Sequence, residues 1–198
     1  MKRPAFWIKH PVILWIAGCS FLTACNAPAG KQNIEKENVS EHWKQQLSEK
    51  LSFLGHRNWI LVVDKAFPEQ NAPGIEYIYV NEHLVPVLKQ VIAQVHQSGH
   101  IKSIAYQDKE LGFITEKQVK GIVQFRADVK RILGKQEVQT LLHDSVFKKL
   151  DKETRLFKVL VIKTNELIPY TSVFLQLDCA YWNSMKEREL RTVMDLNQ

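Results

Sequence analysis

Residues 54–68 read LGHRNWILVVDKAFP, and this stretch decides the fold. Its centre, Trp59–Val63, is a continuous apolar run of strand length, typical of a strand that is buried on both faces of a parallel sheet. Asp64 follows this run directly, and His56 lies in the turn before it. Because ligand sites in parallel sheets gather at the carboxyl ends of the strands, Asp64 is a candidate site residue.

Apolar runs of strand length alternate with helical patterns through the rest of the chain. The expected strands cover residues 59–63, 76–80, 101–106, 138–142, 157–162 and 172–177. The expected helices cover residues 40–54, 84–98, 115–134 and 144–150, and the third of them opens at a capping box from Thr115 to Gln118. This alternation predicts an α/β fold with a mainly parallel sheet flanked by helices. We assign the domain to residues 42–184 and a polar, helical tail to 185–198.

The first 24 residues predict a secretory signal peptide of the lipoprotein type. A positively charged start precedes a short apolar run over residues 12–22, which is less than the roughly 20 residues that span a bilayer. The run ends at Leu22-Thr23-Ala24-Cys25, which resembles the lipobox of bacterial lipoproteins. We therefore expect cleavage before Cys25 and a lipid, palmitate included, on this residue. The alternatives are Cys19, whose preceding residues also fit the pattern, and an uncleaved membrane anchor.

This resemblance to lipoproteins predicts a protein anchored at the bacterial cell envelope, with its domain in the periplasm. Ala27, two residues after Cys25, stands where an Asp would be expected for retention in the inner membrane, so the outer membrane is favoured. Residues 25–41 are polar and poor in large apolar groups, and they predict a flexible tether between lipid and domain.

The composition of the 198-residue chain is that of an ordinary globular protein, with 45% hydrophobic and 24% charged residues. These proportions exclude collagen-like, fully disordered and multi-span membrane proteins. The formal net charge is +6, but Lys2, Arg3 and Lys9 belong to the signal segment, and their removal halves the charge to +3. We therefore expect no nucleic-acid partner. Cleavage would also leave Cys179 as a single unmodified cysteine, so no internal disulfide is expected.

Three places beside the predicted buried strands hold residues suited to chemistry, because burial perturbs polar groups. His56 and Asp64 flank the first strand, and His143 lies where a strand gives way to a helix. The third place surrounds Pro169 and holds Glu166, Tyr170 and Ser172. Histidine and aspartate move protons at neutral pH, and the others bind hydroxyl groups. By spacing alone, however, a histidine at a turn is more often a capping or packing residue, and an aspartate after a strand is often a turn former.

These three places lie in segments that resemble the motifs of a known protein family. Residues 54–68 resemble the opening motif of the D-ribose pyranase / L-fucose mutarotase family, in which Leu-Gly-His is followed by an apolar strand, an Asp and a loop ending in Pro. Residues 163–176, KTNELIPYTSVFLQ, resemble the family's later motif around Pro-Tyr-Ala-Asn. Residues 143–148, HDSVFK, are similar to a third segment in which His is followed by Phe-Lys. The segments occur in the family's order and cover about residues 47–182.

The resemblance implies a cofactor-independent isomerase that interconverts ring forms or anomers of a ribose- or fucose-like monosaccharide. It makes His56 the catalytic histidine and Asp64 the carboxylate that pairs with it and with the sugar. The sugar-contacting positions that it implies are His143, Lys148, Tyr170 and Ser172. We place His143 in the catalytic group as well and add Glu166 to the sugar-binding group. Because members of the family form rings with the site at a subunit interface, the resemblance also implies a homo-oligomer.

The chain departs from the family pattern mainly at the sugar-contacting positions. Ser172 replaces the family's Asn, Lys163 an Arg and Asn165 a Gly, whereas His56 and Asp64 are retained. The pattern fits an enzyme with shifted sugar specificity, a non-catalytic saccharide-binding module, or a structural envelope lipoprotein on the same fold.

His96 and His100 are spaced for a helix-borne metal site but have no third ligand, so we expect no metal.

Overall fold

The computed structural model describes the backbone of residues 30–136 and 138–197, and the side chains of these ranges from residue 41 onward. The predicted signal peptide, the expected lipidation site Cys25 and the start of the predicted tether lie outside the described residues. Within the described ranges, no helix is long and apolar enough to cross a membrane.

Six strands form one sheet in the order β2-β5-β1-β6-β3-β4. The strands are β1 Trp59–Val63, β2 Ile75–Tyr79, β3 Ile101–Asp108, β4 Val138–Leu141, β5 Val159–Lys163 and β6 Val173–Cys179. Pairs β1·β5, β2·β5 and β3·β4 are parallel, and β6 runs antiparallel to both of its neighbours, β1 and β3. The expected α/β class with a mainly parallel sheet is therefore confirmed.

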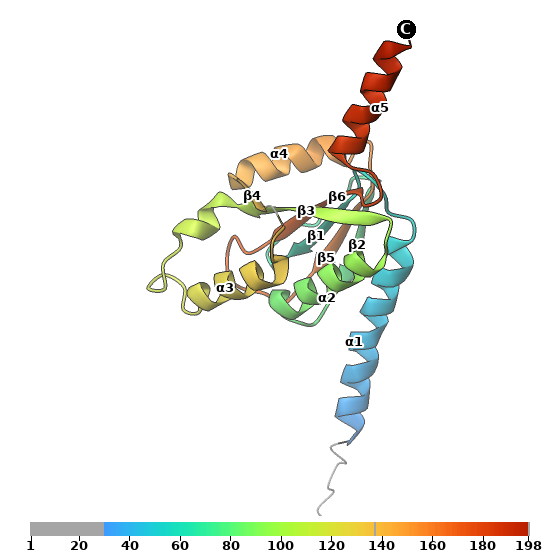
Figure 1. Cartoon of the computed structure of the whole chain (residues 1–198). Coiled ribbons are helices and arrows are strands. Elements are labelled where there is room, and N and C mark those ends of the chain that lie inside the picture. Colours follow the sequence, from blue (N-terminus) through green and yellow to red (C-terminus); the bar gives the residue numbers. More distant parts are fainter. Residues whose placement is uncertain (1–29, 137, 198) are drawn as a thin grey trace, which may run out of the picture.

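Helices cover both faces of this sheet (Figure 1). The helices on the sheet are α1 Gly30–Leu51, α2 Leu84–Gln97, α3 Ile122–Leu133 and α4 His143–Glu153, whereas α5 Ser184–Leu196 projects away from it. Alternate residues of β1 face opposite ways: Ile60 and Val62 pack with α1, α2 and α3, whereas Trp59, Leu61 and Val63 pack with α4. All five residues of β1 are buried, as its apolar run predicts.

Two helices begin elsewhere than predicted. Helix α1 begins at Gly30, so residues 30–41, expected as tether, are helical. Helix α3 begins at Ile122 rather than at the capping box. Gln118 does accept hydrogen bonds from the backbone and hydroxyl of Thr115, but these bonds close a turn. Glu116 instead caps α3, because its carboxylate accepts the backbone N–H groups of Gly121 and Val123.

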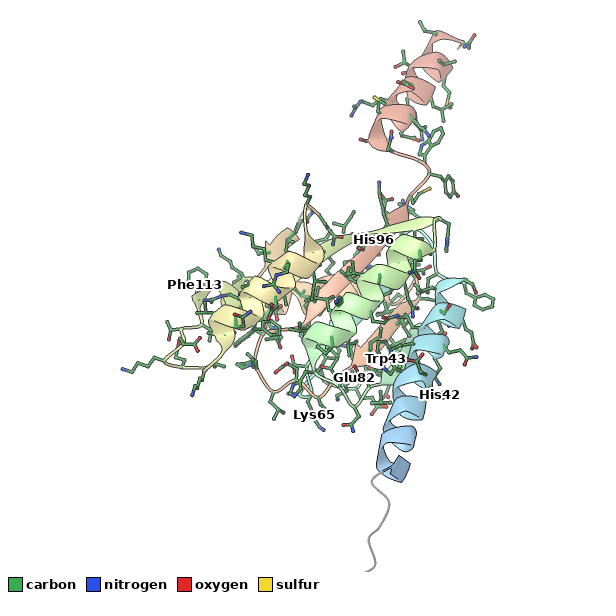
Figure 2. The ribbon with its side chains drawn as sticks, turned by 60° about the horizontal axis from the view of Figure 1, so that its bottom comes forward. His42, Trp43, Lys65, Glu82, His96 and Phe113 are labelled. Carbon is green, nitrogen blue, oxygen red and sulfur yellow. The ribbon has the colours of Figure 1, made fainter. Side chains whose placement is uncertain are left out.

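Helices α1 and α5 leave the body at opposite ends (Figure 1). The last turns of α1 are held on the body by the buried Trp43, whose indole donates to Glu82 at 2.8 Å (Figure 2). Helix α5, the predicted C-terminal helical tail, is capped by the Asn183 side chain but has no buried residue among those described. Among the described residues, α5 therefore contributes nothing to the core.

Candidate functional site

The direction of the strands gathers polar residues at one edge of the sheet. Asp64 follows β1, Asp108 ends β3, and His143 begins α4 shortly after β4. Because β6 runs the other way, its amino end lies at this same edge, where Val173 pairs with both Val62 and Gln107. The loop before β6 therefore adds Tyr170 and Ser172, and we call this end the carboxyl edge.

The carboxylate of Asp64 is held in one orientation by its neighbours. The Ser172 hydroxyl donates to Oδ2 of Asp64 at 2.8 Å and accepts its backbone N–H at 3.2 Å. Oδ1 of Asp64 accepts the backbone N–H of Ala66 at 2.9 Å. Ser172 itself is only 2% exposed. The structure therefore places Ser172 as a support for Asp64 rather than as an exposed sugar-contacting group.

The imidazole of His143 is fixed from several sides. Nδ1 lies 2.9 Å from Oδ2 of Asp108, and the ring meets Phe147 and Tyr170 edge-on, with centroids 4.9 and 5.3 Å away. The backbone N–H of His143, in the first turn of α4, donates to the carboxylate of Glu110. Tyr170 has φ of 57°. Strained backbone of this kind occurs often at functional sites.

A hollow of about 250 Å³ opens between these groups. It is lined by Asp64, Ala66, Phe67, Pro68, His143, Phe147, Pro169 and Tyr170. Aromatic and proline walls with a carboxylate, an imidazole and a phenol suit a small polar ligand that also has an apolar face. The hollow is slightly smaller than pockets for drug-sized ligands, which measure roughly 300–1,000 Å³.

Asp108 is the polar residue of this edge that the sequence analysis missed, since the predicted strand stopped at Tyr106. It is 1% exposed. Burial raises the pKa of Asp108 to about 6, outweighing the hydrogen bond and charge of His143, which lower it. The only feature that could have indicated Asp108 as a site residue is its position at the end of a strand, a position that Asp64 shares.

The raised pKa of Asp108 makes stability depend on pH. The folded protein binds a proton at this group that the unfolded chain, with a pKa of 3.8, has already released. The stability contributed by Asp108 is therefore greatest below about pH 4 and is lost as the pH rises through about 6. We expect the free energy of unfolding of Asp108→Asn, relative to wild type, to rise by roughly 2–3 kcal/mol between pH 4 and pH 7. Urea unfolding at a series of pH values measures this difference, and a pH-independent difference would contradict it.

His56 lies at the opposite end of β1 from Asp64, so the two residues do not meet within one chain, and their expected pairing at a subunit interface stays a prediction. The five residues of β1, at about 3.3 Å each, separate the two ends by roughly 16 Å. Nδ1 of His56 instead lies 2.8 Å from Oδ1 of Asp178, near the end of β6. Partial burial raises the pKa of Asp178, but hydrogen bonds from the Cys179 N–H, Lys102 and His56 outweigh it, and the net pKa is lowered. His56 therefore has as its partner a carboxylate whose pKa lies below its ordinary value.

Two other predicted sugar-binding residues do not line the hollow. Glu166 is 6% exposed, and its carboxylate accepts the backbone N–H groups of Leu167 and Ile168, so that it orders its own loop. Lys148 is exposed on α4. Its neighbour Lys149 turns back over the rings of Trp59 and Tyr106.

Other clusters in the described residues are less suited to chemistry. A larger hollow, of about 640 Å³, lies beside the end of α1, but three of its charged groups, Lys50, Lys158 and Glu76, pair with one another. His96 is exposed on α2, as Figure 2 shows, while both ring nitrogens of His100 contact backbone carbonyls. No group of three potential metal ligands occurs in the described ranges.

Comparison with known proteins matches most of the chain to one family. The model of the RbsD / FucU transport protein family matches residues 38–179. A search of curated proteins gives no match. Among solved structures, Bacillus subtilis RbsD complexed with D-ribose is 21% identical, with a TM-score of 0.48 over 67% of this chain and 91% of that one. FucU from Bifidobacterium longum is 15% identical, with a TM-score of 0.47 over 68% and 94% of the two chains. The fucose mutarotase of Streptococcus pneumoniae in complex with L-fucose is 12% identical, with a TM-score of 0.45 over 66% and 89%.

Proposed function

Because the chain belongs to the RbsD / FucU transport protein family, we propose that it interconverts ring forms or anomers of a reducing monosaccharide without a cofactor. Family membership supports a role in sugar mutarotation, pyranase chemistry or sugar binding. The observation that carries the catalytic proposal is the hollow at the carboxyl edge, where Asp64, His143 and Tyr170 converge. These are groups that transfer protons and bind hydroxyls.

The proposed reaction needs one proton donor and one proton acceptor. The acid gives a proton to the ring oxygen while the base takes the proton of the anomeric hydroxyl, so the C1–O bond of the ring breaks and a C1 carbonyl forms. Rotation about C1–C2 and reclosure on the other face give the second anomer, and reclosure through a different hydroxyl gives the other ring size. Protons are conserved over the cycle. Positioned acids and bases accelerate such proton transfers by roughly 10²- to 10⁴-fold.

The residues of the hollow fit this chemistry. His143 has one ring nitrogen on Asp108, which leaves Nε2 as the atom available to a ligand. Asp64 is held by Ser172 and Ala66 and can accept from sugar hydroxyls with its remaining lone pairs. Phe67, Phe147 and Pro169 provide an apolar wall for the C–H face of a pyranose.

The proposed site is completed by a second copy of the chain. His56, the catalytic histidine by resemblance, lies at the other end of β1 from the hollow. It can reach a hollow only in a neighbouring subunit. A head-to-tail ring, in which the His56 end of one copy faces the carboxyl edge of the next, meets this requirement.

A saccharide-binding module without turnover is the second candidate. Ser172, which replaces the family's Asn, is buried against Asp64 and offers less to a ligand than an amide would. Titration calorimetry and saturation-transfer NMR on a panel including D-ribose and L-fucose separate the two functions. The enzyme accelerates exchange between sugar forms, whereas the binding module produces heat of binding without exchange.

We also propose that the protein is held at the bacterial cell envelope by lipid on Cys25. The support is the lipobox-like sequence alone. Cells that express the chain should incorporate labelled palmitate into it, and Cys25→Ala should abolish the label while Cys19→Ala keeps it. Equal labelling of the wild type and Cys25→Ala would contradict this anchor.

A further inference from the structure

A buried carboxylate stands directly behind the imidazole that lines the hollow. Asp108 is 1% exposed, whereas the side chain of His143 is 40% exposed. Oδ2 of Asp108 lies 2.9 Å from Nδ1 of His143. The buried edge of the ring is thus the Nδ1 edge, and the opposite edge, which carries Nε2, is the one that solvent reaches.

The hydrogen bond between these groups sets the proton on the ring. An ionised carboxylate can only accept, so Nδ1 of His143 must carry the hydrogen. In the neutral imidazole, Nε2 then has a free lone pair. Rotation of the ring is opposed by the edge-on contacts with Phe147 and Tyr170.

Asp108 is a costly group for the fold to keep. Its second oxygen, Oδ1, is buried and has no hydrogen-bond partner in the described part of the chain. Burial raises the pKa of Asp108 to about 6, and the nearby carboxylates of Glu110 and Asp64 raise it further. A half-satisfied buried carboxylate destabilises a protein. Its presence next to a ring in the hollow therefore points to a function rather than to stability.

We propose that Asp108 is a positioning residue, which holds His143 in the Nδ1–H form and directs Nε2 toward the bound sugar. The inference rests on the proposed function of the hollow. In the ring-opening step, Nε2 takes a proton from a sugar hydroxyl or, once protonated, returns it. Asp108 does not touch the sugar and stabilises the positive charge that His143 acquires.

The rate at which the Asp108→Asn variant interconverts sugar forms tests this role. The amide is isosteric and uncharged, and its NH₂ can donate to Nδ1, which favours the opposite tautomer. We expect the maximal exchange rate to fall at least tenfold, with less than about a twofold change in the half-saturating sugar concentration. Asp144→Asn is the matched control, because it also removes a carboxylate next to His143, but an exposed one that does not line the hollow. It should stay within about twofold of wild type.

The ¹⁵N shifts of the His143 ring, measured at a pH where it is neutral, provide a readout independent of turnover. The wild type should show Nδ1 protonated and Nε2 unprotonated, and Asp108→Asn should shift the population toward the Nε2–H form. A wild-type ring protonated at Nε2 would overturn the inference, as would Asp108→Asn exchanging sugar as fast as wild type. If the wild type exchanges no sugar, the proposed function fails, while the ring shifts still decide what Asp108 does.

Discussion

Replacing His143 by asparagine is expected to slow sugar exchange by roughly 10²- to 10⁴-fold without unfolding the protein. Asparagine places its NH₂ group near the position of Nδ1, so the bond to Asp108 can persist. It has no atom at the position of Nε2, where the proton is transferred. The buried carboxylate therefore keeps a partner, and the effect on catalysis is separated from an effect on stability.

Saturation-transfer NMR at several sugar concentrations measures this loss. His96→Asn is the matched control, because His96 is exposed on α2, away from the hollow, and this variant should exchange sugar like the wild type. Circular dichroism and urea unfolding at pH 7 report whether His143→Asn has folded. A folded His143→Asn protein with wild-type exchange would remove His143 from the mechanism.

His56→Ala is expected to lose exchange by at least roughly 10²-fold, although its position is remote from the hollow of its own chain. We expect this loss because, in the proposed ring, His56 acts in the site of the neighbouring subunit. Mixing provides the decisive test of this arrangement. When His56→Ala and His143→Asn subunits are coexpressed in equal amounts, about a quarter of head-to-tail interfaces combine an intact His56 with an intact hollow.

We therefore expect the mixed assembly to recover about a quarter of wild-type exchange, whereas each variant alone stays inactive. A matched control mixes His143→Asn with Asp64→Asn, which damage the same hollow. Every subunit in this mixture has a damaged hollow, so no interface combines an intact His56 with an intact hollow. No recovery is therefore expected. Failure of the first mixture to recover, with assembly intact by light scattering, would contradict a site shared between copies.

Local sequence predicts most of the strands because burial imposes their composition. The apolar run Trp59–Val63 is buried at all five positions and becomes β1 as expected. The start of α1 was not predicted, because its composition carries no comparable apolar pattern. Residues 30–39 are rich in Lys, Glu and Gln, which form helices readily, but they show no apolar stripe to reveal one.

The members of the site depend on strand order and direction, which local patterns do not encode. Ser172 reaches Asp64 only because β6 runs antiparallel beside β1. The strand predicted between His56 and Asp64 already implied that they lie at opposite ends of it, yet the family resemblance grouped them in one site. The proposed second copy of the chain would reconcile the strand geometry with the family resemblance.

The sequence did not predict Asp108 as a site residue for a different reason. Strand β3 runs two residues beyond the predicted end, and this extension carries the aspartate to His143, 35 positions further along the chain. The polar residues Gln107 and Asp108 interrupt the apolar pattern there, so composition alone places the end of the strand at Tyr106. The strand is continued by parallel pairing with β4, where Asp108 aligns with Leu141.

The central claim, that this chain catalyses interconversion of sugar forms, is tested most directly by exchange in the wild-type protein. The full chain is purified in a detergent without a sugar headgroup and added to D-ribose and L-fucose at equilibrium. A preparation of the double variant His56→Ala with His143→Asn, made in parallel, controls for contaminating mutarotases. We predict that saturation of one anomer or ring form transfers to another well above the double-variant level for at least one sugar. Exchange no faster than with the double variant for every sugar in the panel would contradict the account.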